Sequence, residues 1–216
     1  MISEYWHTFL GQYHKRRGIR LLSKACFQKA QSHFEKSILY IEDIESLYFY
    51  AVCLISLNKH EQAINYLSQI YEKTPNENIV AATLLECYIV TRKWELATEM
   101  IEHPNFVKSE NLTLQTLITV AQDPEKREIY ASSKEHFFTA MNDLKNKKID
   151  DALRNIEKAI EYEPENPSYY YTASLIVYEG RRPKADVTFY LEKAIKYAPQ
   201  NEQYKKLLHH IQTRYK

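Results

Sequence analysis

The sequence has few of the residues on which β-rich, disulfide-bonded and membrane-spanning proteins depend. Its 216 residues include only 3 glycines and 7 prolines, so tight turns are scarce and a helical fold is favoured over a β-sandwich or barrel. Its cysteines, Cys26, Cys53 and Cys87, are odd in number and form no CxxC pair, which argues against a disulfide framework and favours buried thiols. No apolar run reaches 18 residues, so we expect no membrane-spanning helix.

The sequence also lacks an excess of either charge. Its 29 Lys and Arg residues balance 28 Asp and Glu residues, the formal net charge is +1, and the two signs are interleaved along the chain. Such a chain has no long-range field to attract a nucleic acid or an anionic membrane, so neither partner is expected. The opening MISEYWHTFLGQYHKRR has no basic leader followed by an apolar stretch, and we therefore expect a cytoplasmic protein.

Motifs for catalysis and metal binding are missing as well. The sequence contains no GxxxxGK[ST], GxGxxG, HExxH or GxSxG pattern. None of the 8 histidines has another histidine four residues away, the spacing that places two ligands on one helix face. The sequence therefore predicts a protein that is not an enzyme and that has no cofactor, no metal site and no catalytic residue.

A repeat is the most informative feature that is present. Residues 156–166 read IEKAIEYEPEN, and residues 191–201, 35 positions later, read LEKAIKYAPQN. Small residues recur at a similar interval, because Ala30, Ala63 and Ala97 are 33 and 34 positions apart, and Ala152 holds the same place ahead of the first quoted segment. A fixed period in the thirties is typical of stacked helical repeats.

This pattern resembles the tetratricopeptide repeat (TPR) family, whose 34-residue unit is a pair of antiparallel helices. The resemblance implies an all-α fold, a right-handed superhelix of antiparallel helix pairs (a TPR-like α-solenoid) with a C-terminal cap helix. Under this interpretation residues 1–104 form units 1 to 3, residues 105–132 form an irregular insert or degenerate repeat, residues 133–201 form units 4 and 5, and residues 202–216 form the cap helix.

The span 105–132 interrupts the period, because Ala97 and Ala152 are 55 positions apart. Pro104 should shorten the helix before it. We expect a short helix at about 111–121 and a second that starts at Pro124, with Asp123 as its N-cap, and that continues into the next unit. A degenerate repeat and an interruption of the superhelix both fit this pattern.

The resemblance also implies a binding surface, because TPR proteins bind ligands on the concave side, which is lined by the first helix of each pair. The basic clamp with which some family members grip acidic chaperone tails is absent here. The residues at the concave positions are mainly apolar and aromatic, and they suit an extended apolar peptide or an amphipathic helix. These predicted partner-binding residues are Tyr48, Val52, Ile55, Ala82, Glu86, Phe137, Met141, Tyr169, Thr172 and Ile176. They could instead be core residues or could mediate self-association as a homodimer.

The predicted function is a protein–protein interaction scaffold, an adaptor or chaperone that captures a peptide or helix from a partner protein. The alternative is a structural subunit of a larger assembly, or a self-associating module, bound through its convex side or its N-terminal aromatic face. That aromatic face consists of Tyr5, Trp6, Phe9, Leu10 and Tyr13. These side chains either cap the first unit or dock another protein, since Trp and Tyr dominate binding hot spots.

Overall fold

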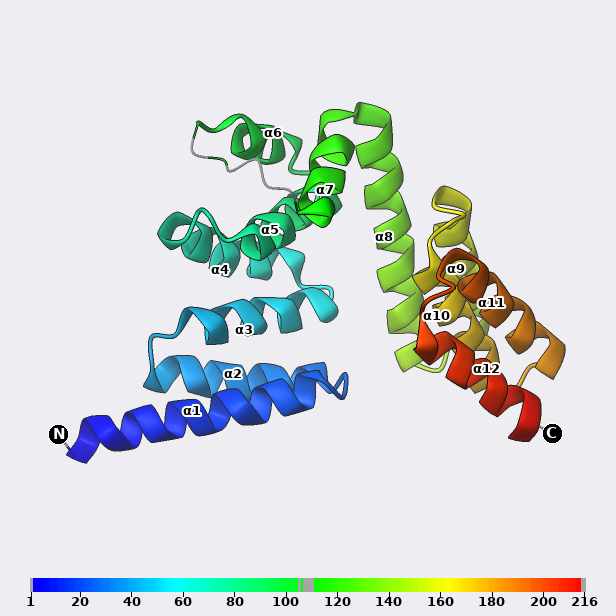
Figure 1. The fold of residues 1–216 in the computed structure, drawn as a ribbon, viewed down its shortest axis with the longest axis horizontal. Coiled ribbons are helices and arrows are strands. Elements are labelled where there is room, and N and C mark those ends of the chain that lie inside the picture. The colour runs from blue at the N-terminus through cyan, green and yellow to red at the C-terminus, as the bar shows by residue number, and fades with distance from the viewer. Residues whose placement is uncertain (1, 105, 107–110, 215–216) are drawn as a thin grey trace. The chain divides into compact units, whose positions relative to one another are not determined.

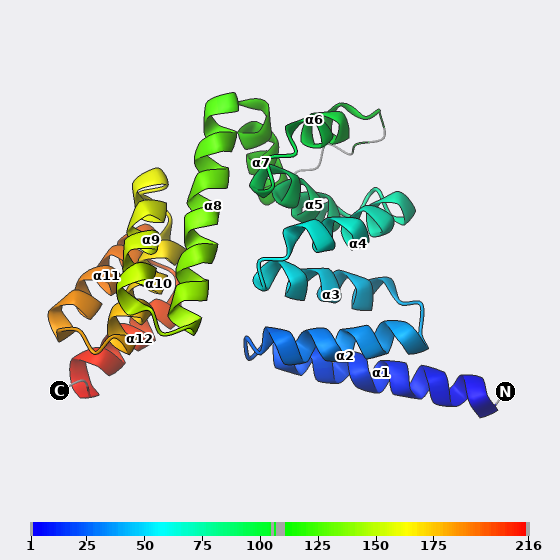
Figure 2. The same cartoon turned by 180° about the vertical axis from the view of Figure 1, so that it is seen from behind.

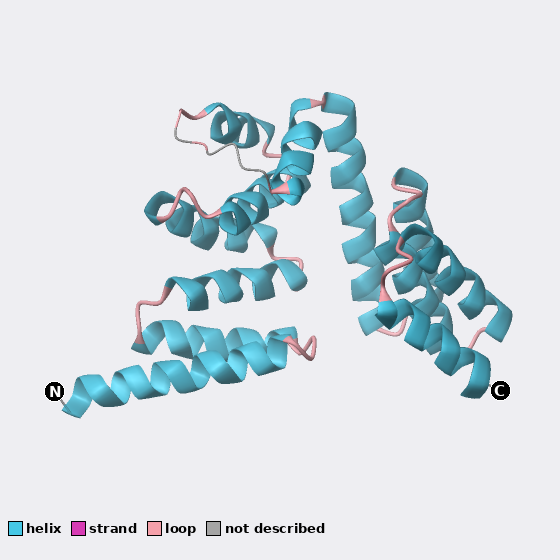
Figure 3. Ribbon diagram, in the orientation of Figure 1, coloured by secondary structure: helices cyan, strands magenta, loops and turns pink. Residues whose placement is uncertain are grey.

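The computed structural model describes residues 2–104, 106 and 111–214. Within these residues the chain is helical and contains no β-strand (Figure 3). In chain order the helices are α1 (Ile2–Leu22), α2 (Phe27–Tyr40), α3 (Ile44–Ser56), α4 (His60–Lys73), α5 (Asn78–Val90), α6 (Trp94–Glu102), α7 (Leu112–Gln122), α8 (Pro124–Lys145), α9 (Ile149–Tyr162), α10 (Pro167–Glu179), α11 (Lys184–Tyr197) and α12 (Glu202–Arg214).

Most successive helices pack against one another as hairpins (Figure 1), which confirms the predicted all-α fold of helix pairs. The small residues that recur with the repeat period lie at these helix contacts. Ala30, Ala63, Ala97 and Ala152 are all buried. A methyl group at each of these places lets two helix axes approach closely, while larger neighbours fill the space beside it.

The turns inside the helix pairs share one backbone feature. Five non-glycine residues among those described have a positive φ, between 52° and 59°, namely Ala25, Asn58, Arg92, Lys147 and Arg181. Their spacing follows the repeat, with intervals of 33 and 34 in the first half of the chain and 34 in the second. Each residue therefore occupies the same left-handed position at the end of a first helix.

Hydrogen bonds show why this conformation recurs. After α8, the Lys147 N–H donates to the Leu144 carbonyl at 3.0 Å, and the Lys148 N–H donates to the Asp143 carbonyl at 2.9 Å. This is the Schellman pattern, in which one left-handed residue turns the chain and lets the next N–H groups satisfy the last helical carbonyls. Glycine is the usual residue there, but this chain does without it at all five turns.

The two helices predicted where the repeat period is interrupted are present as α7 and α8. α6 has only 9 residues and ends two residues before Pro104. The Asn111 side chain accepts a hydrogen bond from the Leu114 N–H at 3.0 Å and caps α7. Asp123 caps α8, which starts at Pro124 and continues through 22 residues into the next helix pair. Since α7 packs against both α5 and α6, it lies where the first helix of a further repeat would lie.

The chain consists of two compact units, Met1–Arg127 and Glu128–Lys216, so the boundary falls within α8. This division into two compact units is coarser than the predicted one. The predicted division into units 1 to 3, an insert, units 4 and 5 and a cap helix remains a prediction. The second compact unit has a core of fully buried side chains from α8, α9 and α10, among them Ala140, Ile156 and Ile176. α12 covers α11, with Ile211 buried and Tyr204 stacked on Tyr171 at a ring-centroid distance of 4.7 Å.

Candidate functional site

α1 is the first helix of its compact unit and lies at the outer end of its stack in both views (Figures 1 and 2). Two glycines let α1 pack closely against Phe34 of α2 and Ile41, the residue that follows α2. A Cβ atom at Gly11 would lie 2.8 Å from the Ile41 side chain, and one at Gly18 would lie 2.8 Å from the Phe34 ring. Because both glycines are buried, they fix which side of α1 faces inward.

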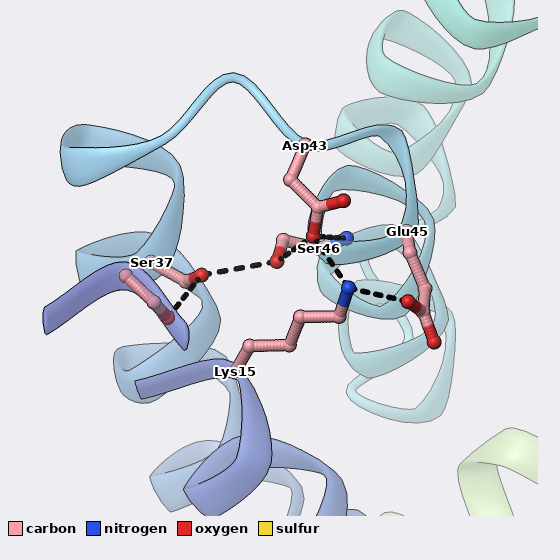
Figure 4. Close-up of polar contacts among 6 residues, drawn as sticks. Lys15, Ser37, Asp43, Glu45 and Ser46 are labelled. Carbon is pink, nitrogen blue, oxygen red and sulfur yellow. Dashed lines mark hydrogen bonds and ion pairs between the residues drawn. The ribbon is translucent and has the colours of Figure 1, made fainter. Parts of the chain in front are cut away.

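A polar cluster on the same inward side joins α1, α2 and α3 (Figure 4). The Lys15 ammonium reaches from α1 to the carboxylates of Asp43, at 3.0 Å, and Glu45. The Ser46 hydroxyl donates to Asp43 at 2.6 Å and lies 3.0 Å from the Ser37 hydroxyl. Ser37 in turn donates to the Gly11 carbonyl at 2.9 Å. Three helices are therefore linked through hydrogen bonds that include two carboxylates and an ammonium.

The charges in this cluster stabilise one another. Burial disfavours the charged form of Lys15, but hydrogen bonds to Glu45 and Asp43 outweigh burial and raise the pKa of Lys15 above its ordinary value. Burial also opposes ionisation of Asp43, yet the hydrogen bonds from Ser46 and Lys15 hold the pKa of Asp43 below its ordinary value. Both groups are charged at neutral pH, so this ion pair helps to hold α1 against α3.

A pair of histidines forms a second contact between α1 and α2. The Nδ1 atoms of His14 and His33 lie 2.9 Å apart, so one ring must donate a hydrogen bond and the other must accept it. Burial is the main cause that lowers the pKa of both rings. The positive charge of Lys36 lowers the pKa of His14 further, and His14, Lys36 and Arg17 lower the pKa of His33 further. The pair therefore favours the neutral form.

With its inward side anchored, α1 directs a row of aromatic side chains outward. Tyr5 is 71% exposed, and Phe9 and Tyr13 are each 52% exposed. The row continues into three exposed arginines, Arg16, Arg17 and Arg20. An open depression of about 450 Å³ runs along this side of the helix. We call its lining the α1 face, which consists of Tyr5, Thr8, Phe9, Gln12, Tyr13, Arg16, Arg17 and Arg20.

The structure thus separates the two interpretations of the N-terminal aromatics. Leu10 is partly buried, as a capping role requires, but Tyr5, Trp6, Phe9 and Tyr13 are more than half exposed. That three arginines extend this aromatic face was not predicted from the sequence. Arginines at the helical positions that continue the aromatic row, seven and eleven residues after Phe9, are the signal that could have revealed it.

The predicted concave strip is divided between the two compact units. In the first unit Tyr48, Val52, Ile55 and Glu86 are partly buried, whereas Ala82 is buried. Tyr48 and Val52 are on α3 and Ala82 and Glu86 on α5, and the Tyr48 hydroxyl lies 3.3 Å from the Thr83 hydroxyl of α5. Three side chains from α3 and Glu86 from α5 are thus the partly accessible members of the strip in this unit.

In the second unit the strip is mostly core. Tyr169, Thr172 and Ile176 are buried, so the structure assigns them to internal packing instead of an open groove. The Tyr169 hydroxyl donates to Glu163 at 2.8 Å, and its ring stacks on Phe137 with 5.3 Å between centroids. Phe137 packs against the same core, which leaves Met141, 40% exposed, as the accessible side chain of this group.

Other predicted features can be placed as well. Cys53 and Cys87 are buried thiols, and burial raises the pKa of Cys53 to about 12, but Cys26 is only partly buried. Within the described part of the chain, no group of three or more His, Cys, Asp or Glu side chains is arranged to hold a metal ion. Nor does any helix in that part combine the length and apolar character needed to cross a membrane.

No protein-family model matches the sequence, and no curated protein matches it either. Solved structures do. The chain is similar to a chain of the APC/C hetero-tetramer Cut9–Hcn1, with 13% identity and a TM-score of 0.50 over 93% of this chain and 42% of that chain. It is also similar to TTC0263, a thermophilic TPR protein of Thermus thermophilus (15% identity, TM-score 0.40, 94% and 98% of the two chains).

A further similar structure is the TPR2AB domain of yeast Sti1 in complex with pHSP90, with 16% identity and a TM-score of 0.45 over 94% of this chain and 83% of that chain. The similarity to the Cut9–Hcn1 chain agrees with three features of this structure. These are the helix pairs, the small residues buried between them, and the turn residues that recur every 33 or 34 positions. The chain is a TPR-like α-solenoid.

Proposed function

We propose that this chain is a scaffold that binds protein partners through apolar and aromatic surface that its repeats leave uncovered. The α1 face carries the proposal, because three aromatic side chains that are at least half exposed follow one another along a single helix. Exposed apolar patches of this kind mark interaction sites. Tyr, Trp and Arg are the residues most enriched in binding hot spots, and the α1 face combines tyrosines with arginines.

The anchoring of α1 supports the same proposal. Side chains lose less conformational freedom on binding when the helix that carries them is already fixed. Gly11 and Gly18 set the close approach of α1, and Lys15 holds it to α3 through Asp43. The aromatic row is therefore presented by a helix whose orientation within its unit is already determined.

A second surface fits the capture of a peptide or helix. On the concave side of the first unit, Tyr48, Val52 and Ile55 are partly accessible, and Ile79 at the start of α5 is 57% exposed. These side chains suit apolar anchors of an extended peptide. An adaptor that holds one protein at the α1 face and a peptide at this strip is the finer form of the proposal.

Photo-cross-linking in the source cells tests the proposal. A photoreactive phenylalanine analogue at Phe9 should cross-link to another polypeptide chain. The same analogue at Leu39, which is 79% exposed on α2, is the matched control and should give little cross-linked product. Tyr13→Ala should reduce the yield from Phe9, because it removes the neighbouring aromatic anchor. Equal yields from Phe9 and Leu39 would show that the α1 face has no preference for protein and would overturn the proposal.

A further inference from the structure

The α1 face has two chemically different halves. Its first half holds the aromatic rings of Tyr5, Phe9 and Tyr13, and its second half holds the guanidinium groups of Arg16, Arg17 and Arg20. No ion pair joins these arginines to an acid anywhere in the described residues, and α1 has no acidic residue within four positions of any of them. The rings contact aromatic neighbours on α1 itself, namely Trp6 and His14, and remain at least half exposed. The arginines therefore lack an acidic partner, and the exposed rings of a second chain could provide a different one, since arginine binds well over aromatic rings.

We propose that the α1 face binds the α1 face of a second copy of this chain, with the two helices antiparallel. This inference rests on the proposed function, because it names the partner of the same surface. A two-fold axis that meets the helix between Gln12 and Tyr13 would bring Phe9 level with Arg16 of the second copy. It would likewise bring Tyr5 level with Arg20, so each aromatic–arginine pair would occur twice.

Charge determines the orientation. In a parallel pair the arginines of the two copies would lie at the same level and would repel one another. In the antiparallel pair, at 1.5 Å per residue, the two copies of Arg16 would lie about 10 Å apart along the axis and the two copies of Arg20 about 22 Å apart. These separations exceed the Debye length of about 8 Å at physiological ionic strength, so the remaining repulsion is largely screened.

Thiol cross-linking of the full-length chain tests both the pairing and its direction. Cys26→Ser first removes the partly exposed native thiol, while Cys53 and Cys87 are buried. Tyr5→Cys and Arg20→Cys are then made separately in this background. Under mild oxidation a mixture of the two variants should give a disulfide-linked dimer, and each variant alone should give little. A dimer of the Tyr5→Cys chain with itself would indicate parallel helices and would overturn the proposed arrangement.

Sedimentation velocity tests the energetic role of the arginines. Arg16→Glu combined with Arg20→Glu should weaken self-association at least about tenfold, because several arginine–aromatic contacts are lost together. Lys24→Glu combined with Lys29→Glu is the matched control, since it changes the net charge equally at exposed positions outside the α1 face and should leave the dimer intact. Circular dichroism should show that both variants remain folded.

A wild-type chain that sediments as a monomer at all accessible concentrations would overturn this inference. The photo-cross-link at Phe9 then separates the two claims. If the chain is a monomer and Phe9 cross-links to a different protein, the proposed function stands. The partner of the α1 face would then be an acidic protein able to pair with the arginines, not a second copy of the chain. Failure of both experiments would remove the function together with the inference.

Discussion

The turn after α8 offers a quantitative test of the repeat geometry. Lys147 is exposed and has a φ of 59°. The left-handed conformation costs a non-glycine residue about 1–2 kcal/mol, whereas glycine adopts it readily. Glycine also gives the unfolded chain more freedom, which offsets about 0.4–1 kcal/mol of that gain. We therefore expect Lys147→Gly to raise the free energy of unfolding by about 0.5–1 kcal/mol.

Lys145 provides a matched control, because it is also an exposed lysine but is the last residue of α8. Glycine inside a helix is less favourable than most residues, so Lys145→Gly should lower the free energy of unfolding by up to about 1 kcal/mol. Urea unfolding followed by circular dichroism measures both changes. If Lys147→Gly destabilised the chain as much as Lys145→Gly does, Lys147 would not be left-handed in solution and the repeated turn would be refuted.

Three further outcomes are expected. Ala152→Leu should lower the free energy of unfolding in urea by about 1–3 kcal/mol, because this buried methyl group has no space to grow. Phe137→Ala should lower the thermal midpoint more than Met141→Ala, since the Phe137 ring packs against the core and Met141 is exposed, and equal shifts would place Phe137 at the surface. The lowered pKa values of His14 and His33 stabilise the fold above the ordinary histidine value of 6.5, and this stability is lost as the pH falls through the folded-state values. Thermal midpoints from pH 8 to pH 5 should therefore fall less steeply for His33→Gln than for the wild type.

Helix boundaries were the most predictable part of the fold, because single residues determine them. Pro104 has no N–H to donate and restricts the residue before it, and α6 ends just upstream. Asp123 and Pro124 provide a side-chain cap and a preset φ, and α8 begins between them. These are local effects, which need no knowledge of the tertiary structure.

The turn conformation could not be predicted from composition. Scarcity of glycine suggested few tight turns, yet each turn inside a helix pair has one left-handed residue. Ala25, Arg92 and Lys147 are chemically unrelated, so no residue type marks the position. What they share is their place after the last carbonyls of a helix that must reverse direction, and the hydrogen bonds gained there offset the local strain.

The binding strip shows a different limit. Helical spacing gives the direction of a side chain around its own axis, but its depth depends on how tightly the next helices pack. Tyr169 and Ile176 have the predicted helical positions and are nevertheless buried, because side chains from α8 and α9 cover them. Conversely, the exposure of Phe9 follows from α1 being the end of its stack, because no other described helix of the first unit lies beyond it (Figure 1).

The most direct test of the α1 face is hydroxyl-radical footprinting read by mass spectrometry. Phe9 is 52% exposed on α1 and Phe189 is 53% exposed on α11, so the two rings should be oxidised at similar rates in a dilute solution of the isolated chain. In the assembly recovered from the source cells, we expect protection of Phe9 together with Tyr5 and Tyr13, with Phe189 oxidised as before. Oxidation of Phe9 at the same rate in the assembly and in the dilute chain would contradict the assignment of α1 as a protein-binding surface.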